Sequence, residues 1–357
     1  MAGTIGPWWL RLPADRRRLR LRAVRDGLVL AGLMTTAFIL VVIPLVGRSF
    51  GFDAISYWFH DLPGRYTVAG WGIYQLGAFR YAPPIGLLFS AFGALPWWVF
   101  VTLWTALLVG CLIWLGGRWT LMLVALPPVA LELYHGNIHL LIAVALALGF
   151  RYPAAWSFVL LTKVTPGVGL LWFAVRREWR ALAIALGATA AISAISYLVA
   201  PGLWSDWYGS LASGLANPAE LSIPPPLWIR FPAAILLVVW GARTDRPWTV
   251  AIAATLALPN LWPHGLVVAL GAVPFLRKGI TRVPRATPSA VPMSGSQHAI
   301  VGRDWRRVTS LRGFIAAAAA AITIGLGVAV LAGSVLQPVL TSASSAILAG
   351  AGNAYPP

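Results

Sequence analysis

Residues 27–47 read GLVLAGLMTTAFILVVIPLVG, an apolar run of 21 residues that contains no charged side chain. A helix needs about 20 apolar residues to cross the hydrocarbon core of a bilayer, so this run predicts a transmembrane helix. Residues 1–26, directly before the run, contain seven arginines, and no small-residue cleavage site follows it. A basic segment before a first span favours an uncleaved amino terminus on the cytoplasmic side.

The composition extends the membrane prediction to the whole chain. Of the 357 residues, 59% are hydrophobic and 10% are charged, whereas an ordinary soluble domain carries about 25% charged residues. A soluble fold of this length has too little interior to bury so much apolar surface. The net charge of +17 is spread between apolar segments, which indicates membrane topology and anionic lipid headgroups rather than a nucleic-acid partner.

Eleven apolar segments predict an all-α polytopic membrane protein with about 10–11 transmembrane helices. Several segments are short, and Pro127–Pro128, Pro166–Gly167 and Pro259 mark breaks, so we expect some broken or re-entrant helices buried in protein. The segments are residues 27–47, 79–96, 97–116, 119–134, 138–150, 153–175, 181–200, 226–242, 247–262, 264–276 and 313–336.

Lysine and arginine divide unequally between the two predicted sides of the membrane. With the amino terminus inside, the inner segments carry 20 of them and the outer side carries six, which include Arg118. This excess favours the chosen orientation and places the carboxyl terminus outside. We therefore expect a basic cytoplasmic amino terminus (1–26), a transmembrane core (27–276), a disordered cytoplasmic link (277–312), a terminal transmembrane helix (313–336) and an outer tail (337–357).

The first outer segment, residues 48–78, holds the acidic residue of greatest interest. Phe52, Ile55, Trp58 and Phe59 recur at helical spacing, which predicts a short helix in the plane of the interface. Asp53 stands at the start of this helix. Its carboxylate is suited to capping the helix, and this role leaves one oxygen free for chemistry.

Three basic residues are candidates for binding or proton transfer. Arg80, followed by Tyr81, lies at the outer mouth of the second span, where it can hold a phosphate or extend to lipid headgroups. Lys163 is the one clear intramembrane lysine, and such a charge is expected to face a cavity or a partner. His264 lies at an outer turn, where it can transfer protons or play a structural role.

A polar cluster occupies the turn between the segments 119–134 and 138–150. Its members Glu132, His135 and His139 have the i,i+3 and i,i+4 spacing of helical metal sites, and Asn137 lies among them. Two histidines and one glutamate are a weak metal signal, and no metal is our prediction. Counting spans places this turn inside, away from Asp53; if the two segments form a re-entrant pair, the cluster faces the same cavity as Asp53.

The order of several short motifs resembles glycosyltransferase family 87, over about residues 27–275. This family comprises actinobacterial polyprenyl-phosphate-mannose-dependent α-mannosyltransferases with the GT-C membrane fold. The chain has Gly136-Asn137-Ile138-His139 where the family usually has a Gly-Gln-x-Asn turn. The motifs are Asp53, Tyr57, Tyr74, Phe79-Arg80-Tyr81-Ala82-Pro83, Gly136-Asn137, Leu161-Thr162-Lys163 with Pro166, and Arg176-Arg177-Glu178-Trp179-Arg180.

The resemblance implies an enzyme of the plasma membrane with its active site on the outer, periplasmic side. It transfers mannose with inversion from a polyprenyl phosphate to a glycolipid or glycan acceptor, and arabinose is an alternative donor sugar. Asp53 matches the catalytic residue and serves as the base, and His264 matches a late outer histidine. A donor with one phosphate needs no metal or other cofactor. The donor phosphate and substrate would be bound by Arg80, Tyr81, Lys163, Tyr57 and Asn137.

Two other classes of function fit the same residues. Lys163 and the broken spans suit a lipid or sugar transporter or flippase with a site at the bilayer midplane. In a non-catalytic membrane partner, the outer acidic and basic residues would be scattered rather than gathered around one cavity. The three classes therefore differ in whether Asp53, Lys163 and His264 share one cavity.

Overall fold

The computed structural model describes residues 14–47, 50–58, 66, 79–216 and 223–276. Throughout these residues the regular elements are helices, with no strand, which confirms the all-α prediction. The predicted link 277–312, the terminal helix 313–336, the outer tail 337–357 and Tyr74 lie outside the described residues.

Three helices of the described chain are long and apolar enough to cross a membrane, so this is a membrane protein. The first is α1 (Ala14–Ala37), which continues through η2 (Phe38–Val42) into α2 (Ile43–Gly47). The second is α5 (Trp97–Gly116), extended by η5 (Gly117–Trp119) and α6 (Thr120–Val124), and the third is α11 (Trp179–Val199).

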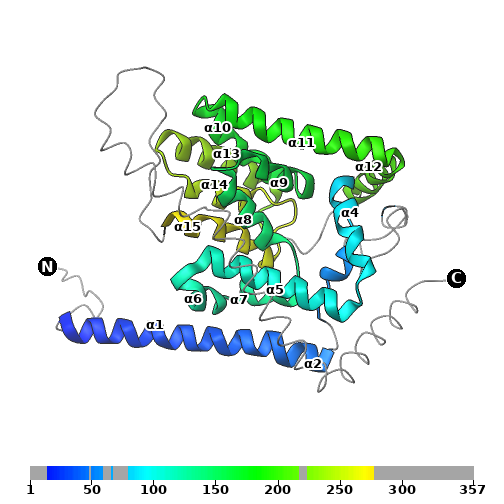
Figure 1. Ribbon diagram of the computed structural model, residues 1–357. Coiled ribbons are helices and arrows are strands. Elements are labelled where there is room, and N and C mark those ends of the chain that lie inside the picture. Colours follow the sequence, from blue (N-terminus) through cyan, green and yellow to red (C-terminus); the bar gives the residue numbers. More distant parts are fainter. Residues whose placement is uncertain (1–13, 48–49, 59–65, 67–78, 217–222, 277–357) are drawn as a thin grey trace.

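The three long helices occupy different places in the molecule. Helices α1 and α11 run along opposite sides, with the shorter elements between them (Figure 1). Only 11% of the apolar window of each is buried, against 56% for α5. Apolar helices with so little protein contact expose their side chains to lipid, whereas α5 belongs partly to the core.

Helix α1 and its continuation η2 contact the rest of the protein at α6 and α7. Thr36 Oγ1 donates a hydrogen bond of 2.6 Å to the carbonyl of Val124. A Cβ atom at Gly32 would lie 2.2 Å from the carbonyl oxygen of Ala125, so the two backbones meet at a distance that only glycine allows. These contacts anchor α1, while Leu28 and Met34 stay exposed.

Helices α7 (Pro127–His135) and α8 (His139–Gly149) form a pair bent by 110°. Neither helix alone reaches across a bilayer, because nine and eleven residues at about 1.5 Å each are too short. Gly136 ends α7 in the left-handed conformation, with φ at 68°. The segments 119–134 and 138–150 are therefore not two separate spans, and the apolar run breaks at Pro127.

Several of the remaining predicted spans are also divided by proline and glycine, whereas 226–242 is one helix that continues through Pro232. The segment 153–175 breaks at Lys163 and Val164, and residues 201–216, between two predicted spans, form a helix. Thus several of the eleven apolar runs are present as helices too short to cross alone. The elements are α4 (Pro83–Ser90), η4 (Ala91–Ala94), η6 (Pro153–Ala155), α9 (Trp156–Thr162), η7 (Thr165–Leu170), α10 (Leu171–Val175), α12 (Pro201–Ala216), α13 (Leu227–Arg243), α14 (Trp248–Leu256), η8 (Pro263–Ala272) and α15 (Val273–Leu276).

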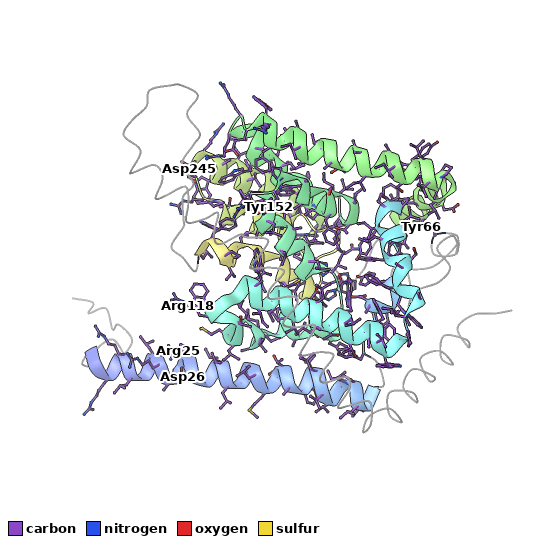
Figure 2. The ribbon with its side chains drawn as sticks, viewed as in Figure 1. Arg25, Asp26, Tyr66, Arg118, Tyr152 and Asp245 are labelled. Atoms are coloured by element: carbon purple, nitrogen blue, oxygen red, sulfur yellow. The ribbon has the colours of Figure 1, made fainter. Side chains whose placement is uncertain are left out.

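Charged side chains gather at one end of the molecule. Figure 2 shows Arg25, Asp26, Arg118 and Asp245 toward the same end, with Tyr66 at the other. Arg118 therefore lies with the basic end of α1, and its assignment to the opposite side is wrong. The reason is that α4 and η4 are too short for a span, so the run of α5 is reversed relative to the predicted order.

Candidate active site

Asp53 lies beside the end of α7, although the two are far apart in the sequence. The backbone N–H of Gly51 donates to the carbonyl of Tyr134 at 2.9 Å, and that of Asp53 donates to the carbonyl of His135 at 2.8 Å. The 3₁₀ helix η3 (Ala54–Tyr57) follows, and all four of its residues are buried. The predicted interfacial helix is thus a single buried turn.

The side chain of Asp53 does not cap this turn. The residue stands at the N-cap position, but its carboxylate makes no capping hydrogen bond. The hydroxyl of Ser56 donates instead to the backbone carbonyl of Asp53 at 2.6 Å. The carboxylate therefore points to other partners.

Three side chains approach one oxygen of this carboxylate. The amide nitrogen of Asn137 donates to Asp53 Oδ2 at 2.6 Å. His264 Nε2 lies 3.7 Å from the same oxygen, and His135 Nδ1 lies 4.0 Å from it. Asn137 is itself oriented, because its Oδ1 accepts the N–H of Ile138 at 2.7 Å. The carboxylate is held through Oδ2, and the described contacts leave Oδ1 unengaged.

Burial raises the pKa of Asp53 above its ordinary value, because burial disfavours the charged form. The hydrogen bond from Asn137 and the charges of His135 and Lys163 lower the pKa, and the charge of Glu132 raises it. A carboxylate with a raised pKa is a stronger proton acceptor near neutral pH. The environment thus makes Asp53 suitable as a base.

His264 opens η8 and joins two other imidazoles. Its ring lies 4.9 Å from that of His135 and 5.2 Å from that of His139, centroid to centroid. On another side the ring of Trp262 is nearly parallel, at 12°. Helix η8 packs on α7 and α8, which is why a residue more than a hundred positions later in the chain reaches the α7–α8 turn.

Glu132 and His139 form a buried pair next to these rings. His139 Nδ1 lies 3.0 Å from Glu132 Oε2, and the N–H of Leu140 donates to Glu132 Oε1 at 3.2 Å. Ligand atoms of Glu132, His139 and His264 all lie within 4.8 Å of one another, so these residues could hold a metal. Zinc bonds of about 2.0–2.1 Å would require the three atoms to close to about 4 Å or less.

Lys163 ends α9 and faces the same cluster. Its backbone is extended, with φ at −142°, and its charge acts on Asp53 and Glu132. Among the described residues, no carboxylate lies within salt-bridge distance of its ammonium group. An intramembrane cation that is not neutralised in this way is available to an anionic ligand.

Tyr57, Tyr81 and Arg80 lie to one side of this cluster. The hydroxyls of Tyr57 and Tyr81 are 3.1 Å apart, and Tyr57 is 1% exposed. Arg80 Nη1 donates to the carbonyl of Ser210 in α12 at 2.7 Å, and Trp207 Nε1 donates to the carbonyl of Arg80 at 3.1 Å. The described contacts therefore tie Arg80 to α12 rather than to Asp53.

The structure brings Asp53, Asn137, Lys163 and His264 together, and it adds Glu132, His135 and His139. The side assignment that separated the polar turn from Asp53 is wrong, because the 110° bend returns the chain toward residue 53. The spacing of Glu132, His135 and His139 was the sequence signal for these three residues. That signal gave their proximity to one another, but it did not connect them to Asp53 or His264.

Comparison with known proteins identifies a family. A family model described as glycosyltransferase family 87 matches residues 79–277, more than half of the chain. The matched range includes α7, α8, Lys163 and His264 and begins after Asp53. No curated protein and no solved structure matches significantly.

Proposed function

The chain belongs to glycosyltransferase family 87, and on this basis we propose that it transfers mannose with inversion from a polyprenyl phosphate to a glycolipid or glycan. The acceptor would be met at the outer face of the plasma membrane. One observation supports this proposal above the others: a carboxylate fixed through Oδ2 lies in a buried cluster that also contains an unneutralised lysine. A base and a cation are what transfer from a phosphate donor requires.

Asp53 is the proposed general base. As the acceptor oxygen attacks the anomeric carbon, its proton passes to Asp53 Oδ1, and the bond from that carbon to the phosphate oxygen breaks. The lipid phosphate leaves with the bonding electrons. Attack opposite the leaving group converts a β-phosphoryl donor into an α-linked product. Asn137 keeps the carboxylate in place throughout this step, since it binds the other oxygen.

Lys163 is proposed to stabilise the negative charge that develops on the leaving phosphate. A fixed ammonium in a site of low polarity stabilises such charge more strongly than the same group in water. His264, within 3.7 Å of Asp53, would assist as a proton-transfer group. Tyr57 and Tyr81 would line the donor site, and Arg80 would contact the phosphate or hold α12 beside the donor.

The proposed setting is a GT-C fold with a cytoplasmic amino terminus. A polyprenyl donor stays in the bilayer and presents its sugar at headgroup depth. The basic end of α1 and Arg118 would face the cytoplasm, in keeping with the positive-inside rule. Because the donor carries a single phosphate, the side chains named above suffice for charge neutralisation, and neither a metal nor another cofactor enters the proposal.

The direct test is Asp53→Asn in membranes supplied with polyprenyl-phosphate-mannose and a mannoside acceptor. We expect turnover to fall by about 100-fold or more, because a general base contributes about 10²- to 10⁴-fold to the rate. Asp26→Asn is the matched control, because Asp26 is exposed on α1 and paired with Arg25. Wild-type turnover by the Asp53 variant would remove this residue from the mechanism.

A transporter or flippase is the competing use of the broken helices, in particular the bent α7–α8 pair. Transport requires two compartments, whereas sugar transfer does not. Mannose transfer by purified protein in detergent, without a gradient, therefore separates the two functions.

A further inference from the structure

Glu132 contacts both sides of the break between α7 and α8. Its carboxylate is fully buried, and each oxygen has a described partner, Oε2 with His139 Nδ1 and Oε1 with the N–H of Leu140. Its backbone carbonyl accepts the N–H groups of Gly136 at 2.8 Å and of Asn137 at 3.3 Å. One residue thus connects the end of one helix, the turn and the start of the next.

A carboxylate at this place is not explained by packing. Removing it from water costs several kcal/mol unless it is hydrogen-bonded, and an apolar side chain of similar volume avoids that cost. The neighbouring buried positions on α7, Ala130 and Leu133, are apolar. The hydrogen bonds of Glu132 therefore point to a requirement for defined geometry.

The carboxylate of Glu132 orients the neighbouring histidine His139. The ionised carboxylate of Glu132 accepts a hydrogen bond from His139 Nδ1, and in this tautomer Nε2 presents its lone pair. That Nε2 atom is buried and has no hydrogen-bond partner among the described residues. The His139 ring contacts His264, whose Nε2 lies 3.7 Å from Asp53. Glu132 is thereby connected to the carboxylate of Asp53 through two rings.

The backbone carbonyl of residue 132 acts on the turn between α7 and α8. The carbonyl of Glu132 binds the turn at Gly136 and Asn137, and Asn137 holds Asp53 at 2.6 Å. The backbone of residue 132 therefore helps to hold the turn that carries Asn137, whatever side chain stands at this position. The His264 ring and the Asn137 amide approach one oxygen, Oδ2 of Asp53.

We propose that Glu132 is a positioning residue whose side chain, through His139, sets the orientation of His264 toward Asp53. The proposal rests on the function proposed above for Asp53. It differs from a metal site built on the same residues, in which Glu132 would be a ligand rather than a hydrogen-bond acceptor.

The test compares Glu132→Gln with the wild type in kcat, KM and pH dependence of sugar transfer. A glutamine keeps one oxygen to accept the N–H of Leu140, so its amide nitrogen faces His139 Nδ1, donates to it and moves the ring hydrogen to Nε2. We expect kcat to fall by about 100-fold with little change in KM, as for a misplacement of about 1 Å in a catalytic group. Glu178→Gln, a carboxylate change at an ion pair with Arg176, is the control and should keep wild-type kcat.

The pH profile separates positioning from a merely structural role. The groups that act on Asp53 are His135 and Asn137 at the end of α7, His264 on η8, Lys163, and Glu132. Because the charge of Glu132 raises the pKa of Asp53, its removal should move the acid limb of kcat/KM to lower pH. A loss of folded protein alone would lower the amount of active enzyme and leave the limb unmoved.

The possible results separate the positioning role of Glu132 from the proposed function of Asp53. The positioning proposal would be overturned if Glu132→Gln kept wild-type kcat and an unmoved acid limb while Asp53→Asn was inactive. An active Asp53→Asn variant would instead overturn the proposed function. Stoichiometric metal in the wild type, with activity lost on chelation, would also overturn positioning. If Glu132→Gln does not accumulate, His139→Phe is the second variant, because it keeps a buried ring and the bond from Leu140. Unchanged kcat in His139→Phe would overturn the positioning proposal.

Discussion

Replacing Asn137 by alanine removes the one described hydrogen bond to the carboxylate of Asp53, which is 2.6 Å long. A hydrogen bond to a charged group contributes about 1.5–3 kcal/mol. This bond stabilises the ionised form of Asp53, so its loss should raise the pKa of that carboxyl.

The assay is the pH dependence of kcat/KM for sugar transfer by Asn137→Ala. A base must be unprotonated to act, so activity falls below its pKa, and the acid limb should move to higher pH. Ser56→Ala is the control, because the Ser56 hydroxyl bonds the backbone carbonyl of Asp53 and not its carboxylate. An unmoved limb in an active Asn137 variant would refute the assignment of Asp53 as the base.

Two further substitutions test the turn and the cation. Gly136→Ala should lower stability by about 1–2 kcal/mol, because φ is 68° and the added Cβ would lie 2.8 Å from that of Ala54; an unchanged melting temperature would contradict this. Lys163→Met should lower kcat by about 100-fold or more, with partial recovery in Lys163→Arg, measured with the same donor and acceptor. Equal turnover of Lys163→Met and wild type would exclude the ammonium from phosphate stabilisation.

The sequence was sufficient for the long helices and for identifying four polar residues that lie together. Uninterrupted apolar runs predicted α1, α5 and α11, because each run is long and apolar enough to span a bilayer as one helix. Asp53, Asn137, Lys163 and His264 were predicted as site residues, and they lie together. Charged and polar groups in an apolar chain are costly, so their presence is informative without any structure.

The sequence was not sufficient for the path of the chain between those helices. Counting spans assumes that every apolar run crosses the membrane, and the 110° bend at Gly136 violates that assumption. An apolar residue buried in protein has the same hydropathy as one in lipid, so composition does not separate a re-entrant helix from a span. For the same reason, the sequence predicted a helix at the membrane surface where the structure has a buried turn, Ala54–Tyr57. The spacing of the apolar residues fits both.

The pairing of residues 51–53 with the carbonyls of Tyr134 and His135 couples Asp53 to α7. Asp53 and Asn137 are thereby both held at the carboxyl end of this helix. Bilayers of different thickness tilt their helices, and such a tilt would displace both residues together. In the proposed mechanism, the depth at which a lipid-linked sugar meets Asp53 is therefore set by the placement of α7.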